Sequence, residues 1–275
     1  MPAGEAGGAF PGAGSTIRSS AKRAYLKILD ASLFVNSRFY GGSGFSCPVC
    51  NGKFRKMMPF KGHYYVRGVL VDHYTPNARC PRCRSEIRHR FILTFLKGKS
   101  GFLAEKIRLL HFAPEAFLSA YLSRQPNIEH VKCDIDPANF PGAIRADITD
   151  IPFDAGSFDA VICIHVLEHI EDDSRAIREI YRILRPGGWA LVAIPVYGET
   201  TYEIKGLSYG EREKAYGTGQ HMRMNGLDFV SRLSDAGFSV ETVSFDDVPG
   251  DYIDRTVKTP HTESDRFLFW LTKSR

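Results

Sequence analysis

Residues 158–195 constrain the fold of this 275-residue chain most, because they read as a strand, a helix and a second strand. Residues 161–164 form a short apolar run, which is typical of a parallel strand covered on both faces. Apolar residues then recur at helical spacing until Pro186 ends the helix, and the two glycines after it favour a tight turn. The segment therefore predicts a β-α-β unit.

The same alternation continues on both sides of this unit. Strands are expected at 107–112, 128–133, 143–146, 240–245 and 266–272, and helices at 116–122 and 227–236. Only six residues separate Asp136 from Ala143, which is too few for a normal helix between the second and third strands. Strands alternating with helices predict an α/β fold with a doubly wound parallel sheet, whose ligands bind beyond the carboxyl ends of the strands.

The central segment also resembles the second half of class I S-adenosylmethionine-dependent methyltransferases of the type 11 kind. Three phrases carry the resemblance: Phe158-Asp-x-Val161, Val166-Leu-Glu-His169 and Leu184-x-Pro-Gly-Gly188. It implies a Rossmann-like, seven-stranded sheet in the order 3-2-1-4-5-7-6, S-adenosylmethionine as the cofactor and methyl transfer as the activity. Hydrophobic periodicity alone would fix no strand order.

Two acids stand where such a domain binds its cofactor. Asp134 follows the second strand, 23 residues after His111, at the spacing of a ribose-binding acid that accepts hydrogen bonds from vicinal hydroxyls. By resemblance, Asp147 lies near the adenine amino group and Ile148 packs on the base. The alternative is that both acids are turn or cap residues. The full set expected at the cofactor is His111, Phe112, Ala113, Glu115, Asp134, Ile135, Asp147, Ile148 and His165.

The first loop departs from the family pattern. The family has glycines after the first strand, whereas Ala113, Glu115 and Phe117 stand at the corresponding positions here. We favour a loop that runs differently, with its backbone and Glu115 still meeting the methionine end of the cofactor. The same loop wording resembles a methyltransferase subgroup that also carries amino-terminal cysteine pairs. The alternative is a non-catalytic, zinc-binding interaction protein that no longer binds the cofactor.

Four of the six cysteines form two Cys-Pro-x-Cys pairs, Cys47 with Cys50 and Cys80 with Cys83. Two such pairs complete a tetrahedral site of four sulfurs, which predicts one structural zinc in a zinc-ribbon-like module. A rubredoxin-like iron site is the alternative. Disulfides are not expected, because no secretory segment precedes the pairs. The long segment 51–79 between the pairs predicts one or two hairpins, and Cys133 and Cys163 are expected to be buried in strands.

The chain divides into four expected parts. Residues 1–15 are expected to be disordered, 16–44 to form an amphipathic helical segment, 45–90 the zinc module, and 91–275 the methyltransferase domain with a lid-like insertion at 197–225. The helical segment is expected to pack on the zinc module, with a membrane surface as the alternative. No apolar run reaches the roughly 20 residues of a membrane span, and a cytoplasmic location is expected.

Charge is distributed unevenly between the two halves. Residues 1–104 hold 17 Lys and Arg against 4 Asp and Glu, and the remainder holds 19 against 27. This asymmetry indicates a polyanionic partner or docking between the halves. The arginine-rich stretch 79–90, with nearby aromatic residues, would suit RNA. The alternative is a helix from Arg88 to Leu96 that docks the zinc module, with its arginines bonding carbonyls or acids of the acidic half.

Transfer to a hydroxyl acceptor calls for a general base. We expect His221, in the polar insertion, to be this base and Arg223 to orient the acceptor, with His165 as the rival base. Glu168 and His169 belong to the family wording and are expected to be structural. The acceptor is expected beneath the insertion and to be a hydroxyl of a small molecule or saccharide, with RNA as the alternative. The sequence predicts no oligomeric state.

Overall fold

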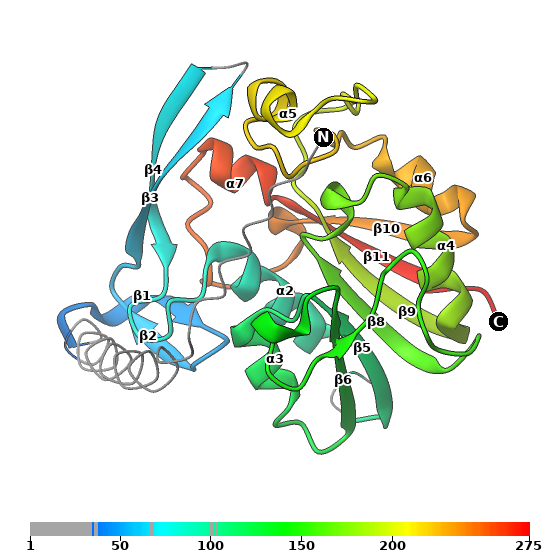
Figure 1. Ribbon diagram of the computed structural model, residues 1–275. Coiled ribbons are helices and arrows are strands. Elements are labelled where there is room, and N and C mark those ends of the chain that lie inside the picture. Colours follow the sequence, from blue (N-terminus) through cyan, green and yellow to red (C-terminus); the bar gives the residue numbers. More distant parts are fainter. Residues whose placement is uncertain (1–34, 36–37, 67–68, 100–101, 103) are drawn as a thin grey trace, which may run out of the picture.

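The computed structural model describes residues 35, 38–66, 69–99, 102 and 104–275 (Figure 1). An α/β domain surrounds a seven-stranded sheet, and a smaller β-rich part carrying the four cysteines precedes it. The disorder expected for 1–15 and most of the helical segment expected within 16–44 lie outside the described residues. Among the described residues, no helix combines the length and the apolar character needed to cross a membrane.

The large sheet has the strand order that the resemblance implied. Its strands are β5 (Ile107–Phe112), β6 (Ile128–Asp134), β7 (Ile144–Arg145), β8 (Phe158–Ile164), β9 (Leu184–Ala193), β10 (Phe238–Ser244) and β11 (Phe267–Lys273). They lie in the order β10-β11-β9-β8-β5-β6-β7, which is 3-2-1-4-5-7-6 when the strands are counted from β5. The first five run parallel, and β11 is antiparallel to both β9 and β10. The expected order is confirmed.

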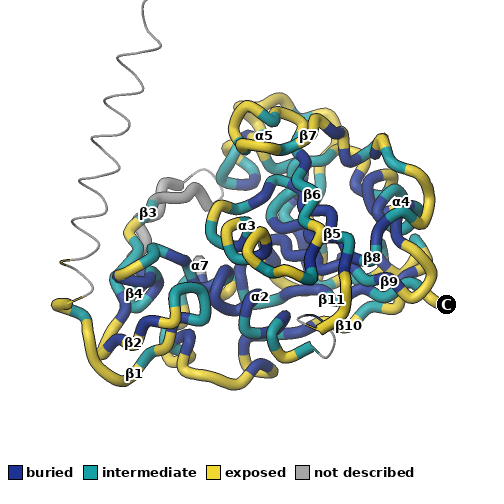
Figure 2. Tube along the Cα trace, turned by 90° about the horizontal axis from the view of Figure 1, so that it is seen from below, coloured by how far each residue is buried: buried dark blue, intermediate teal, exposed yellow. Residues whose placement is uncertain are grey.

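Alternation along the central strands fills two separate cores, which is why the sheet is covered on both faces. Leu109 and Ile162 pack with α2 (Ile87–Gly98) and α3 (Ala116–Leu122) on one face. Leu110 and Val161 pack with α4 (Asp173–Ile183) and α6 (Phe229–Asp235) on the other. The buried central strands are enclosed between these layers in Figure 2.

Local sequence explains the ends of the central helix. Asp172 caps α4, because its side chain accepts a hydrogen bond from the backbone N–H of Arg175. After α4, Gly187 adopts φ of +75°, and a Cβ on Gly188 would lie 2.9 Å from a backbone oxygen. The Pro-Gly-Gly turn therefore needs both glycines, one for conformation and one for close approach. Between β6 and β7 the short span forms only η1 (Pro137–Asn139), as expected.

The cysteine-bearing part contains two antiparallel pairs of strands. β1 (Gly41–Cys47) pairs with β2 (Gly52–Phe54), and β3 (Met58–Val66) forms a long hairpin with β4 (Val69–Arg79). This part contacts the segment near the carboxyl end: Ser46 N–H donates to the Asp251 carbonyl at 2.9 Å, and Asn77 donates to Asp254 at 2.8 Å. The remaining elements are η2 (Leu167–His169), α5 (Tyr209–Tyr216), η3 (Phe245–Asp247) and α7 (Pro260–Ser264).

Candidate functional site

The four predicted cysteines meet at one point. Sγ of Cys47 lies 3.7 Å from that of Cys83, and Sγ of Cys50 lies 3.7 Å from that of Cys80. A tetrahedron of sulfurs with zinc–sulfur bonds of about 2.3 Å has edges of about 3.8 Å, whereas a disulfide would need about 2 Å. The spacing of the sulfurs therefore fits a tetrahedral metal site, and no disulfide joins these cysteines.

Each cysteine pair ends in the same kind of turn. Asn51 follows Cys50 with φ of +54°, and Arg84 follows Cys83 with φ of +60°. The left-handed residue turns the chain back after each pair, so that both sulfurs of a pair face one centre. The hydroxyl of Ser85 lies 3.3 Å from Sγ of Cys47 and 3.2 Å from Sγ of Cys83. Ser85 stands two residues before the start of α2.

Helix α2 docks the cysteine-bearing part onto the α/β domain. Arg90 is fully buried, and its guanidinium donates to the carbonyls of Ala78, Ser85 and Tyr252. Buried carbonyls need donors, and one guanidinium supplies five N–H groups. This is the docking alternative stated for the arginine-rich stretch. The arginines of this helix bond carbonyls, and Arg88 also bonds acids of the second half, Glu115 and Asp265.

The loop after β5 lacks the family glycines but keeps a left-handed turn. Ala113 has φ of +43°, and His165, at the end of the neighbouring strand β8, has φ of +52°. Phe112 pairs with Cys163 between these strands, so the two turns lie side by side at the carboxyl edge of the sheet. Non-glycine residues in this region cost roughly 1–3 kcal/mol and cluster at functional sites. The strain marks this edge as the candidate cofactor site.

Glu115 lies at this edge and contacts α2. Its Oε1 atom lies 2.8 Å from Nε2 of His89 and 3.2 Å from Nε of Arg88. Burial alone would raise the pKa of Glu115, but His89 and Arg88 lower it to about 2. Its Oε2 atom is buried and meets no hydrogen-bond partner among the described residues. Arg88 also contacts Glu86 at 2.9 Å and Asp265 at 3.4 Å.

The two acids expected at the ribose and the adenine lie on adjacent strand ends. The N–H of Ala146 donates to the backbone carbonyl of Asp134 at 3.0 Å, which ties the end of β6 to the residue before Asp147. Each carboxylate caps its own turn: Asp134 accepts from the N–H of Asp136, and Asp147 accepts from Thr149. Bonds from Thr149 hold the pKa of Asp147 below its ordinary value.

The apolar residues beside these acids differ in exposure. The side chain of Ile135 is 57% exposed, whereas Ile148 is only 4% exposed and packs in the core. Ile135 therefore offers more free apolar area for an adenine than Ile148 does. The side chains of His111 and Phe112 are buried, and Nδ1 of His111 faces Nε2 of His130 at 3.2 Å. The open edge of β5 is thus backbone and Ala113.

A second cluster lies just beyond the end of β8. Nδ1 of His165 lies 3.2 Å from Oε1 of Glu168, and its Nε2 lies 3.5 Å from Oδ1 of Asp265. The rings of His169 and His221 make an edge contact with 5.1 Å between centroids. Single donor atoms of Glu168, His169 and His221 lie within 4.8 Å of one another. Glu168 and His169 are expected from the sequence to be structural, and no spacing signal links them to a histidine 52 residues beyond His169.

The protonation states in this cluster differ. Burial lowers the pKa of His221 to about 4, so its imidazole is neutral at pH 7. Burial also opposes charge on His165, but the contact with Glu168 and the nearby Asp265 raise its pKa above the ordinary value. Burial would raise the pKa of Glu168, and the neighbouring His165 outweighs this and lowers it. Glu168 is therefore an ionised, buried carboxylate.

Arg223 has a different position from the one expected. Its side chain is fully buried, and its guanidinium donates to the carbonyls of Leu167, Ile170 and Glu171. It also lies 3.2 Å from Glu203 and 3.3 Å from Asp173. Because the side chain is fully buried and its two terminal nitrogens bond groups inside the protein, Arg223 is not placed to orient an acceptor. It instead clamps the insertion to the loop that carries the second cluster.

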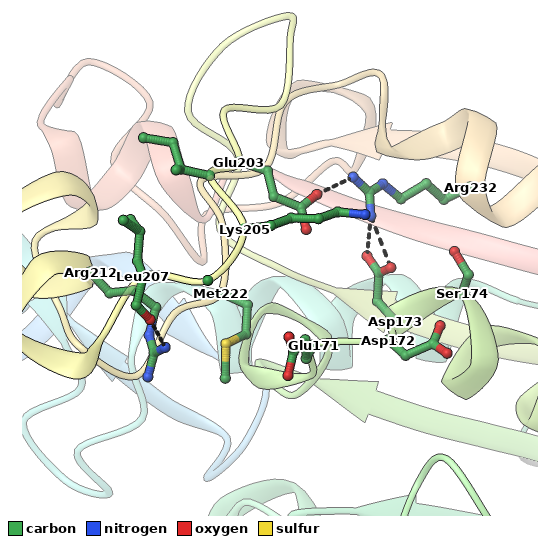
Figure 3. A pocket seen from close by; sticks show the side chains of 12 residues that line it. Glu171, Asp172, Asp173, Ser174, Glu203, Lys205, Leu207, Arg212, Met222 and Arg232 are labelled. Carbon is green, nitrogen blue, oxygen red and sulfur yellow. Dashed lines mark hydrogen bonds and ion pairs between the residues drawn. The ribbon is translucent and has the colours of Figure 1, made fainter.

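A cavity of about 730 Å³ lies between this insertion and the start of α4. Figure 3 shows Glu171, Asp172, Lys205, Arg212 and Met222 among its walls. Two of its acids are paired, because Arg232 bonds Glu203 at 2.7 Å and Asp173 at 2.9 Å. The insertion, which includes α5, thus forms one wall of a polar cavity.

The family comparison covers the central β-α-β region. Residues 114–192 match the family model described as a methyltransferase domain. The mitochondrial arginine hydroxylase NDUFAF5 of Danio rerio is 32% identical over 112 residues, which are 40% of this chain and 35% of that protein. An uncharacterized methyltransferase of Mycobacterium sp. (strain KMS) is 33% identical over 93 residues, 30% of this chain and 36% of that protein. The chain thus spans about a third of the length of these relatives.

Two solved structures are also similar. The [4+2]-cyclase SpnF has a TM-score of 0.47 at 21% identity, covering 67% of this chain and 82% of its own. The YcgJ protein of Bacillus subtilis has a TM-score of 0.45 at 14% identity, covering 68% and 99%. The strand order and the family match agree with each other. Residues 114–192 therefore belong to a methyltransferase domain of the class I S-adenosylmethionine-dependent type.

Proposed function

We propose that this protein is an S-adenosylmethionine-dependent methyltransferase that methylates a hydroxyl of a small molecule or saccharide. One observation carries the proposal: two strained turns and two carboxylates converge at the carboxyl edge of a methyltransferase-type sheet. Ala113 and His165 provide the turns, and Asp134 and Asp147 provide the carboxylates. Ligands of doubly wound sheets bind at this edge, where the strand order reverses.

The residues at this edge suit the parts of S-adenosylmethionine. The buried Oε2 atom of Glu115, which lacks a partner among the described residues, would accept from the methionine ammonium. Asp134 would hold the ribose hydroxyls, and Ile135 and Asp147 would contact the adenine. The bound cofactor supplies an activated methyl group on its sulfonium.

The chain's own contribution is positioning, water exclusion and proton transfer. Holding donor and acceptor in line can supply roughly 7–11 kcal/mol of the barrier. The polar cavity beneath the insertion is the proposed acceptor site, because its carboxylates and cationic side chains suit a hydroxyl-rich molecule. His221 is the proposed proton acceptor, since its Nδ1 atom meets no partner among the described residues. His165 has acids at both ring nitrogens and is the weaker candidate.

The RNA alternative has less support from the contacts. Arg90 is committed to carbonyls, Arg88 to three acids, and Arg79 to Glu86 at 2.9 Å. These side chains would have to give up buried or half-buried partners to meet phosphates. Arg82 is exposed, so its side chain can contact a phosphate in the RNA alternative.

Isothermal titration calorimetry of the full chain with S-adenosylhomocysteine tests the proposal. We expect one binding site per chain, and the absence of binding would support the non-catalytic alternative. Cofactor consumption is then measured against hydroxylated metabolites, glycans and RNA. Methylation of RNA alone, with activity falling steeply as salt rises, would overturn the proposed acceptor class.

A further inference from the structure

The donor atoms of Glu168, His169 and His221 converge from two distant parts of the chain. Glu168 and His169 lie in η2, directly after β8, and His221 lies near the end of the insertion. Two backbone contacts hold the parts together: Met222 N–H donates to the Glu168 carbonyl at 2.8 Å, and His169 Nδ1 lies 3.1 Å from the Gln220 carbonyl. The cluster is therefore built by tertiary structure.

The carboxylate of Glu168 is in an unusual environment. The residue is 1% exposed, and neither of its oxygens makes a well-aligned hydrogen bond to another described residue. Its close polar neighbour is Nδ1 of His165, at 3.2 Å. A buried carboxylate is costly unless positive charge and hydrogen bonds surround it. One imidazole contact leaves most of its acceptor capacity unused.

Both histidines keep a ring nitrogen that can act as a metal ligand. A carbonyl only accepts hydrogen bonds, so Nδ1 of His169 must carry its proton toward Gln220. In the neutral ring this leaves the lone pair on Nε2. Such a bond to a backbone carbonyl is the usual way in which metal-binding histidines are oriented. Nδ1 of His221 is buried and also has no hydrogen-bond partner among the described residues.

From this geometry we propose that Glu168, His169 and His221 bind one divalent first-row transition metal ion, separate from the four-cysteine site. Two imidazoles and one carboxylate are a common ligand set for Zn²⁺ and Fe²⁺, and they leave coordination positions open. Donor atoms within 4.8 Å need to close by at most about 1.5 Å to reach the spacing of about 3.3 Å that metal–ligand bonds of about 2 Å require. The ion would add positive charge beside Glu168 and use its free acceptor capacity.

This site deepens the proposed function and rests on it for its chemical role. The cluster follows the strained His165 turn, at the edge where the cofactor is proposed to bind. A hydroxyl acceptor in an open position would have its pKa lowered by the ion, so that its proton passes to solvent water rather than to His221. The acceptor oxygen then bonds the methyl carbon as the bond from that carbon to the sulfonium breaks, and S-adenosylhomocysteine leaves. The ion would also orient the acceptor oxygen toward the methyl group.

Metal content measured on the intact full chain tests the proposal. The protein is equilibrated with Zn²⁺ alone, and in parallel with Fe²⁺ under anaerobic conditions, then dialysed and analysed for metals. Wild type should hold two ions per chain. His221→Ala and Glu168→Gln should each hold one and bind the added ion at least about a hundredfold more weakly, since even outer-shell changes cost 10–100-fold. Cys83→Ser should lose the other ion.

Controls separate this result from misfolding and from the proposed function. His130→Ala, a half-buried histidine that contacts His111 and Ser123 instead, should keep both ions. His221 lies in the insertion and is the safer variant if Glu168→Gln fails to fold. Wild type with only one ion, or His221→Ala with two, would overturn the metal site. If wild type does not bind S-adenosylhomocysteine, the proposed function is wrong. The number of metal ions per chain is unaffected by that result.

Discussion

Arg88, in the helix that follows the cysteine cluster, forms an ion pair with Glu115 in the glycine-free loop, with 3.2 Å between Nε and Oε1. The helix begins two residues after Ser85, whose hydroxyl contacts two of the cysteine sulfurs. A continuous chain of contacts therefore runs from the expected zinc to the expected cofactor. The basic first half thus docks on acids of the second half at this point, which accounts for part of the charge asymmetry.

This connection predicts that the cysteine site supports cofactor binding. Cys83→Ser should lose the thiolate-bound zinc, destabilise the start of α2 and weaken S-adenosylhomocysteine binding by about 1–3 kcal/mol, the usual size of coupling between sites. Elemental analysis and calorimetry measure the two effects. Cys133→Ala, a buried cysteine of β6 outside the cluster, is the control and should keep the zinc. Zinc loss with unchanged binding would show that the two sites are independent.

Asp134 is predicted to be the ribose-binding acid. Asp134→Ala should weaken S-adenosylhomocysteine binding by about 1.5–3 kcal/mol, the scale of hydrogen bonds to a charged group. The matched control is Asp136→Ala, because Asp136 is also exposed near the end of β6 but caps η1. Equal affinity of wild type and Asp134→Ala in calorimetry would remove Asp134 from the site.

Arg90 is predicted to be the main polar link between the two parts of the chain. Arg90→Met keeps most of the volume but removes the donor from the buried carbonyls of Ala78 and Tyr252. Each unsatisfied buried group costs about 1–3 kcal/mol, so the free energy of unfolding should fall by about 3 kcal/mol or more. Chemical denaturation measures it. Arg82→Met, at an exposed position of the same stretch, should change it by less than about 0.5 kcal/mol.

His221 is predicted to act in turnover rather than in cofactor binding. His221→Ala should keep the affinity for S-adenosylhomocysteine and lower the turnover number at least about a hundredfold, whether the imidazole takes the proton itself or holds an ion that lowers the pKa of the acceptor hydroxyl. Steady-state kinetics with an identified acceptor, beside calorimetry, separates the two properties. A variant that turns over at the wild-type rate would exclude both roles.

Much of the fold could be predicted because its signals are local. The strand at Ile107–Phe112 and the helix at Ala116–Leu122 have the expected bounds, since apolar runs and turn residues mark them directly. Helix α6 is shorter than expected at both ends, and β10 begins at Phe238, directly after Gly237 with φ of +101°. The cysteine cluster could be predicted from the two Cys-Pro-x-Cys pairs, because the short spacing within each pair fixes its local geometry.

The remaining site features depend on contacts between distant residues. Nothing in the sequence near Arg223 indicates that it would be buried against the loop at 167–171. Likewise, His169 and His221 are brought together by the path of the insertion. Ala113 replaces a family glycine and has a left-handed backbone conformation. Alanine rarely adopts this conformation, so the sequence did not predict it. Such features depend on tertiary packing, which overrides local preference.

His111 gives a prediction about pH. It is fully buried in β5, and desolvation, with a smaller effect of His130, lowers its pKa to about 3 from its ordinary value of 6.5. Between these values the unfolded chain binds a proton at this residue that the folded protein does not. The free energy of unfolding therefore falls as the pH drops through this window, by up to about 1.4 kcal/mol per pH unit from His111 alone.

The variant His111→Phe should remove this contribution while keeping a ring in the core. From pH 6.5 to pH 4.5, wild type should lose about 2 kcal/mol more stability than the variant, because only wild type buries a group that the unfolded state protonates. Denaturant titrations at several pH values measure the difference. Cys163→Ala, on the adjacent strand β8, is the control: burial raises the pKa of this thiol well above its ordinary value, so its stability should run parallel to that of wild type. If the free energies of unfolding of His111→Phe and wild type instead change in parallel with pH, His111 takes up its proton in the folded protein. His130 or solvent would then have to reach its ring.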